Sequence, residues 1–144
     1  MKTGKLAAVC CLILATIGLW ASEKAKPCTR QDAIRVDKEA SSLRSWTELY
    51  KSYKKFAQCD DGGIGEGYSD SIAHLLSDHW NSANQLNRLV SHDKDFEGFV
   101  LRHVDELMSP AQAEKIRDNA EARCPSGAKR LCEKITARIK ETGP

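Results

Sequence analysis

A cluster of carboxylates is the first group of residues in this chain that could support chemistry. The segment Asp60-Asp61-Gly62-Gly63-Ile64-Gly65-Glu66-Gly67 contains four glycines in eight residues, and Asp70 follows it. Because glycine-rich composition is typical of loops, the sequence predicts an acidic loop over 60–70. Asp60, Asp61, Glu66 and Asp70, with Tyr68, could bind a basic partner or, weakly, calcium. The simpler interpretation is a solvated turn whose acids lie near a helix N-terminus, where the helix dipole favours them.

The catalytic and cofactor-binding motifs with known sequence signatures are absent. The chain has no G-x-S-x-G nucleophile elbow, no H-E-x-x-H zinc helix and no phosphate-binding glycine loop. The acidic segment departs from a calcium-binding EF-hand loop, because Asp60 and Asp61 are adjacent and the glutamate comes too early. We therefore expect no cofactor.

Histidines are the second group that could support chemistry. His79 and His103 fall on the apolar stripes of two consecutive predicted helices, so helix pairing could bring their imidazoles together. Such a pair could hold a metal or act as an acid–base group. More often, histidines on an apolar face are core residues that are satisfied by a hydrogen bond. We expect His74 and His92 to lie at the surface.

The N-terminus predicts export. The segment Leu6–Trp20 carries no charge over 15 residues, follows two lysines and ends beside the small residue Ala21. This is the pattern of a secretory signal peptide, and the run is shorter than the roughly 20 residues of a membrane-spanning helix. An uncleaved anchor is the alternative. We predict a signal peptide over 1–21 and one secreted or periplasmic domain over 22–144, with no stable membrane span after cleavage.

The charge of the mature chain argues against binding to nucleic acid. Without Lys2 and Lys5, the 22 basic residues fall to 20, which equals the 20 acidic residues. A nucleic-acid-binding domain is expected to be basic. The charges are segregated, because residues 22–58 and 123–144 are basic whereas residues 59–122 are acidic. Either the terminal helices neutralise the middle of the chain, or an acidic surface steers a basic partner.

Apolar periodicity predicts an all-α, single-domain bundle of about five helices. Apolar residues recur every three or four positions in each of them. The expected elements are a continuous helix over 30–57, a second from Ser69 or Asp70 to about residue 90, a third over 96–107, a fourth beginning at Pro110 and a fifth over 128–139. Ser109-Pro110-Ala111-Gln112 is a strong start signal, with a capping serine, a proline in the first helical position and a glutamine in the third.

The mature chain has four cysteines, which predict two disulfides, because exported proteins fold in an oxidising compartment where cysteine pairs form disulfide bonds. Their spacings do not fit the close pairs of a zinc site. A continuous helix over 30–57 would be about 42 Å long, whereas bonded cysteines have Cα atoms within about 7 Å. Cys28 and Cys59 would then lie at opposite ends of that helix. The sequence therefore predicts that Cys28 and Cys59 each pair with Cys124 or Cys132.

In organisation alone, with a signal peptide, helices and two disulfides, the chain is similar to small periplasmic immunity or inhibitor proteins. Helical ligand carriers such as insect odorant-binding proteins share this outline, but they have six cysteines or four with other spacings. We predict an exported, non-enzymatic protein-binding domain that docks through the loop 60–70 on a protein with a basic surface. Two alternatives stay open: a carrier of a small ligand or metal through His79 and His103, and a small hydrolase.

Overall fold

The computed structural model describes residues 26–142, so the predicted signal peptide lies outside the described part. The described residues form one all-α domain without a strand, which confirms the predicted fold class. Its α-helices are α1 (Arg30–Asp37), α2 (Trp46–Phe56), α3 (Gly62–Asp78), α4 (Ala83–His92), α5 (Lys94–Arg102), α6 (Pro110–Ala122) and α7 (Lys129–Thr142). Short 3₁₀ helices η1 (Ala40–Ser42), η2 (Ala57–Cys59) and η3 (Trp80–Ser82) join some of them.

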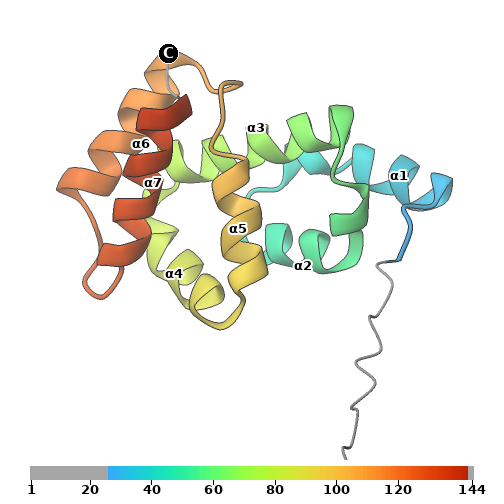
Figure 1. Ribbon diagram of the computed structural model, residues 1–144, viewed down its shortest axis with the longest axis horizontal. Coiled ribbons are helices and arrows are strands. Elements are labelled where there is room, and N and C mark those ends of the chain that lie inside the picture. The colour runs from blue at the N-terminus through green and yellow to red at the C-terminus, as the bar shows by residue number, and fades with distance from the viewer. Residues whose placement is uncertain (1–25, 143–144) are drawn as a thin grey trace, which may run out of the picture.

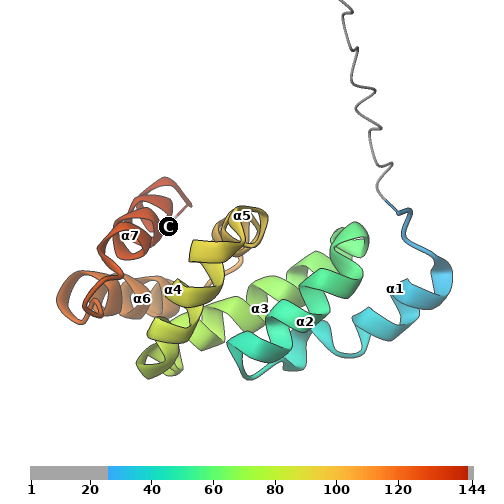
Figure 2. The same ribbon diagram turned by 90° about the horizontal axis from the view of Figure 1, so that it is seen from below.

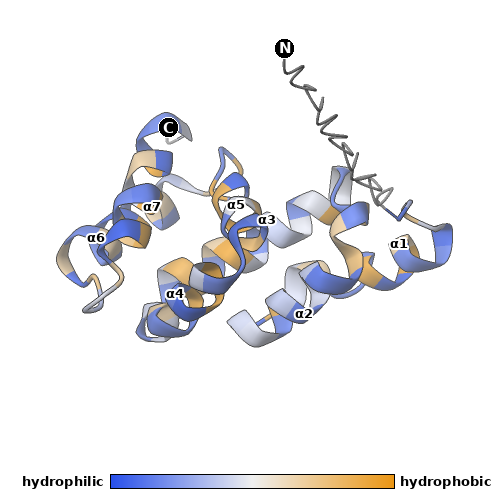
Figure 3. Cartoon of the chain, turned by 60° about the horizontal axis from the view of Figure 1, so that its bottom comes forward, coloured by the Kyte–Doolittle hydropathy of each residue, from blue (hydrophilic) through white to orange (hydrophobic). Residues whose placement is uncertain are grey.

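Helix α3 runs through the middle of the molecule, with α1 and α2 towards one end and α6 and α7 at the other (Figures 1 and 2). Apolar residues gather on the helix faces that meet in the interior, most visibly on α3, α4 and α5 (Figure 3). The largest fully buried side chains include Trp46, Phe56, Tyr68, Phe96 and Phe99. None of the described helices has the length and apolar character needed to cross a membrane.

The last two helices form as the sequence predicts. Ser109 and Gln112 make a reciprocal capping box at the start of α6, and Pro110 occupies its first position. Helix α7 buries Leu131, Ile135 and Ile139, which are spaced four residues apart. Its cations partly neutralise the acidic middle of the chain, because Arg130 and Lys134 contact the buried carboxylate of Glu97 on α5 at 3.0 and 2.9 Å.

The predicted continuous helix over 30–57 is wrong, because it is two helices separated by a turn. Leu43 has an extended backbone, and Ser45 is the N-cap of α2. The Ser45 side chain accepts a hydrogen bond from the Glu48 amide, while the Glu48 carboxylate accepts one from the Arg44 amide at 3.0 Å. These two side-chain hydrogen bonds satisfy backbone amides that would bond to backbone carbonyls if the helix were continuous. They therefore stabilise the start of a new helix.

The two predicted disulfides are present, but the predicted pairing is wrong. Cys28 bonds to Cys59, with their Cα atoms 4.9 Å apart, and Cys124 bonds to Cys132, with theirs 6.1 Å apart. The reason is the turn between α1 and α2, which reverses the chain and returns Cys59 to Cys28. Each disulfide therefore closes a local loop, and neither links the C-terminal region to the first two helices.

The glycine-rich segment is helical rather than a loop. Helix α3 begins at Gly62, after the N-cap Asp61, and not at Ser69 or Asp70. Gly67 is needed for packing, because a Cβ atom at this position would lie 2.9 Å from the Cβ of Ala40 in η1. The glycine thus allows α3 and η1 to approach closely. The same helix ends at Asp78, so the predicted second helix is divided into α3 and α4.

Candidate functional site

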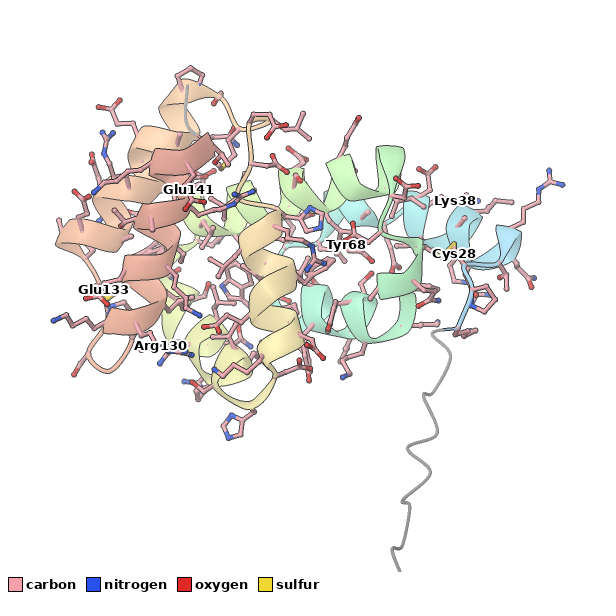
Figure 4. All side chains as sticks on the ribbon, viewed as in Figure 1. Cys28, Lys38, Tyr68, Arg130, Glu133 and Glu141 are labelled. Carbon is pink, nitrogen blue, oxygen red and sulfur yellow. A yellow bond between two sulfur atoms is a disulfide. The ribbon has the colours of Figure 1, made fainter. Side chains whose placement is uncertain are left out.

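The five predicted partner-binding residues lie at the start of α3, but they have different environments. Asp61, Glu66 and Asp70 are exposed, and the Asp61 carboxylate accepts a hydrogen bond from the Gly62 amide at 2.8 Å. Tyr68 is fully buried, and Figure 4 shows its side chain between the helices. Burial raises the pKa of Tyr68 to about 12. Its hydroxyl contacts Ser52, so Tyr68 is not available to a partner.

Asp60 is also turned into the fold rather than towards solvent. Its carboxylate lies 3.1 Å from Nε2 of His103 and 3.6 Å from the guanidinium of Arg102. Burial by itself raises the pKa of Asp60, but the hydrogen bond and charge of His103, together with Arg102, outweigh it and leave that pKa below its ordinary value. Asp60 is therefore an ionised partner of His103.

Ser69 and Asp105 complete this network on the other side of the imidazole. Nδ1 of His103 lies 2.9 Å from the Ser69 hydroxyl, and that hydroxyl donates to the Asp105 carboxylate at 2.6 Å. His103 is only 6% exposed and Ser69 only 3%. We call Asp60, Ser69, His103 and Asp105 the His103 clamp, because they join the start of α3 to the segment that follows α5.

The clamp has the order carboxylate, imidazole, hydroxyl that serine hydrolases use. Ser69, however, has one hydroxyl proton, and it is donated to Asp105. With that proton committed, Nδ1 of His103 meets the Ser69 oxygen as a donor and not as an acceptor. A nucleophilic serine needs the opposite arrangement, in which the imidazole accepts the hydroxyl proton. This hydrogen-bond pattern favours a structural role for the clamp.

An open pocket of about 210 Å³ lies beside the clamp. We call it the acidic pocket; it is lined by Glu66, Ser69, Asp70 and Ala73 of α3, by Leu107 and Met108 of the α5–α6 connection, and by Gln112 of α6. Among the described residues, neither Glu66 nor Asp70 forms an ion pair with a lysine or arginine. Leu107 is 59% exposed and is one of two large exposed apolar side chains in the described part of the chain.

Asp105 connects the clamp to the acidic pocket. One of its oxygens accepts the Ser69 hydroxyl bond, and the other accepts a hydrogen bond from the Leu107 amide at 3.0 Å. Ser69 of α3 and Leu107 of the α5–α6 connection both line the pocket. The clamp therefore fixes the distance between α3 and the α5–α6 connection.

The predicted proximity of His79 and His103 is not found. His103 contacts Asp60 and Ser69, whereas His79 is exposed and contacts His74 at the other end of α3. Ten residues of α-helix separate Ser69 from His79, which corresponds to about 15 Å. The described residues contain no group of three or more histidine, cysteine, aspartate or glutamate side chains placed to hold a metal.

Sequence reasoning missed Asp105 and Leu107, and it treated Ser69 only as a helix cap. The predicted third helix over 96–107 is too long, because α5 ends at Arg102. Leu107 therefore lies exposed in the connection to α6 and not on an apolar helix face. No protein-family model, curated protein or solved structure matches this chain.

Proposed function

We propose that this chain is an exported, non-enzymatic domain of the inhibitor or immunity type that binds another protein through the acidic pocket. The observation that supports this most is the pair of carboxylates, Glu66 and Asp70, which line a pocket without a cation from the described residues. They lie four residues apart on one helix face, so both can approach one ligand group.

The pocket fits a lysine or arginine side chain of the partner. Such a side chain has an apolar stem and a charged head, and the pocket offers Leu107 and Met108 beside the two carboxylates. Exposed charge pairs contribute about 0.2–1 kcal/mol each, so the carboxylates alone would give moderate affinity. Their larger effect is expected on association rate and on the choice of a basic partner.

Rigidity supports a role in recognition. Asp105 holds Ser69 and Leu107 through side-chain hydrogen bonds, and both residues line the pocket. A pocket that is already ordered loses less conformational entropy when its partner binds. The clamp is thus proposed to prepare the pocket for binding.

The disulfides support the export part of the proposal. Cys28–Cys59 and Cys124–Cys132 require an oxidising compartment, which is where exported proteins fold. The signal-peptide pattern of residues 1–21 points the same way.

The two alternatives have weaker support. A hydrolase would use the Asp60–His103–Ser69 order, but it would first have to release the Ser69 hydroxyl from Asp105. A carrier that uses His79 and His103 together would need one cavity that both residues line, but their contacts place them at opposite ends of α3.

A double variant tests the acidic pocket. Glu66→Gln with Asp70→Asn removes both charges with little change of shape. The matched control is Glu114→Gln with Asp118→Asn on α6, because these exposed carboxylates have the same four-residue spacing. Proteins from the native export compartment that bind the disulfide-intact domain would be identified, purified and titrated by calorimetry. We expect the pocket variant to weaken binding about 2- to 30-fold, corresponding to the loss of two exposed charge pairs.

Added salt should reduce the affinity of the wild-type domain and of the control variant, but it should affect the pocket variant much less. Equal weakening by the pocket variant and the control would move the interface away from the acidic pocket. Failure to retain any partner would contradict the proposed function itself.

A further inference from the structure

The exposed end of α3 holds a pair of histidines with facing ring nitrogens. Nε2 of His74 and Nε2 of His79 lie 3.2 Å apart, with the two rings inclined at 66°. His74 belongs to the last turns of α3, and His79 is the C-cap residue of the same helix. We call these two residues the His74–His79 pair. It is separate from the acidic pocket and from the His103 clamp.

The spacing of the two nitrogens is the spacing found around a transition metal. Zinc–nitrogen bonds of about 2.0–2.1 Å at a tetrahedral angle place two ligand nitrogens about 3.3 Å apart. Neighbouring ligands in a square-planar copper site lie about 2.9 Å apart if the bonds have the same length. The observed 3.2 Å lies between these two values, so a metal could bind with little rearrangement.

Asp78 lies beside His74 in the place where a carboxylate accompanies many metal-binding histidines. Nδ1 of His74 lies 3.1 Å from the Asp78 carboxylate, a distance that favours a proton on Nδ1 and a free lone pair on Nε2. Lys115 contacts the other Asp78 oxygen at 2.6 Å. Lys115 thus holds the Asp78 carboxylate in place beside His74.

The backbone of His79 is also fixed before any metal binds. Its carbonyl accepts hydrogen bonds from the Ser82 amide at 2.9 Å and from the Ser82 hydroxyl at 2.6 Å. The next residue, Trp80, is 8% exposed and donates its indole N–H to the Arg123 carbonyl at 2.8 Å. The imidazole of His79 therefore projects from an anchored turn.

One proton shift prepares the pair for a metal. Nε2 of His74 and Nε2 of His79 share one hydrogen bond, so in the metal-free chain one of them carries the proton and the other presents its lone pair. Moving that proton from Nε2 to Nδ1 of the same ring makes both Nε2 lone pairs available, with no net loss of a proton. The His74 side chain is 34% exposed and His79 is exposed, so the remaining coordination positions are open to water.

We propose that His74 and His79 form a two-histidine site for a divalent transition metal of the zinc and copper class, with Asp78 as the orienting carboxylate. The other positions are filled by water or by a donor from a bound partner. With two protein ligands, the site discriminates by the general affinity order, so Cu²⁺ binds more tightly than Zn²⁺.

The test titrates Zn²⁺ and Cu²⁺ separately into the tag-free, disulfide-intact domain by calorimetry. We expect one metal ion per chain. His79→Ala and His74→Ala should each weaken binding at least tenfold, because a single imidazole remains. Asp78→Asn should weaken it about 10-fold, as expected for loss of an orienting group. His92→Ala is the matched control, because His92 is an exposed histidine that bonds only to the nearby Arg88 carbonyl.

Folding of every variant is checked by circular dichroism, so that lost binding is not confused with unfolding. Side-chain nitrogen NMR gives a second measurement, in which Zn²⁺ should shift the Nε2 signals of His74 and His79 and leave that of His103 unchanged. Wild-type protein without saturable binding of one metal ion would overturn the proposal. The proposal would also be overturned if His79→Ala left metal binding unchanged, or if His92→Ala weakened metal binding as much as His79→Ala does.

Discussion

The two ends of α3 carry histidine clusters of opposite character. At its start, His103 is 6% exposed and uses both ring nitrogens in contacts with Asp60 and Ser69. At its end, His74 and His79 turn ring nitrogens towards each other at the surface. The first cluster has its hydrogen-bonding groups satisfied inside the fold, whereas the two histidine side chains of the second are partly or fully exposed to solvent.

The difference follows from where the partners lie in the chain. His103 is 34 residues from Ser69 and 43 residues from Asp60, so its contacts exist only when the whole domain is folded. His74 and His79 are five residues apart, and Asp78 is four residues from His74. His103 therefore contributes to the stability of the whole fold through long-range contacts. The His74–His79 pair depends mainly on the end of one helix, because its contacts are local.

Each end is also associated with its own disulfide. Cys59 directly precedes Asp60 of the His103 clamp, and its bond to Cys28 closes a loop of 31 residues. At the other end, Trp80 next to His79 is bound to the Arg123 carbonyl, and Cys124 follows Arg123. The Cys124–Cys132 bond closes a loop of only 8 residues. The two disulfides therefore allow the two ends to be weakened separately.

The largest expected effect is the loss of the Cys28–Cys59 bond. On the chain-entropy relation, a 31-residue loop contributes about 3.7 kcal/mol and an 8-residue loop about 2.5 kcal/mol. Cys28→Ala with Cys59→Ala should thus lower the free energy of unfolding by about 1 kcal/mol more than Cys124→Ala with Cys132→Ala. Urea denaturation without reductant measures both. The reverse order would show that the C-terminal disulfide stabilises the fold more than its short loop explains.

The next largest effect on the free energy of unfolding is expected when one carboxylate is neutralised at either end of α3. Asp60→Asn leaves His103 without its ionised partner in a buried site, and we expect a loss of about 3 kcal/mol in the free energy of unfolding. Asp78→Asn changes an exposed contact, and we expect a change within about 0.5 kcal/mol. The same urea denaturation compares the two variants. If Asp78→Asn were as destabilising as Asp60→Asn, the contrast between a structural and an accessible end would be wrong.

The all-α fold could be predicted from the sequence because local signals determine the last helices. The capping box at Ser109 and the apolar spacing of α7 depend on neighbouring residues alone. The break between α1 and α2 was missed because Ala40, Leu43 and Trp46 are all buried and keep the helical spacing across the turn. The Ser45-x-x-Glu48 capping signature was the one local signal of the new helix. The disulfide error followed directly from this missed break.

The site could be predicted less well because its contacts are long-range. Glycine composition cannot distinguish a loop from a helix that must approach a neighbour, and at Gly67 the neighbour is Ala40. The general expectation that a histidine on an apolar face is a satisfied core residue holds for His103. It fails for His79, because α3 ends one residue earlier and the helical period no longer fixes the direction of its side chain.

The pH dependence of stability should give the smallest difference between the two ends of α3, but the one most specific to charge. The pKa of Asp60 is below its ordinary value because the hydrogen bond and charge of His103, with Arg102, outweigh the opposing effect of burial. A carboxylate whose pKa is lower in the folded than in the unfolded chain stabilises the fold above its unfolded pKa of about 3.9. That stabilisation is lost as the pH falls through the folded value.

Asp60→Asn lacks this contribution at every pH. The difference in urea midpoint between wild type and Asp60→Asn should therefore be large at pH 6 and shrink towards pH 2.5. The pKa of Asp78 is lowered mainly by Lys115, but at an exposed position, so Asp78→Asn should stay close to wild type at both pH values. A difference for Asp60→Asn that did not change with pH would mean that shape, rather than charge, is what His103 needs from Asp60. If the difference in urea midpoint shrinks at low pH for Asp60→Asn only, the acid-sensitive charge lies at the buried end of α3. The residues that contact His103 there are far from it in the sequence.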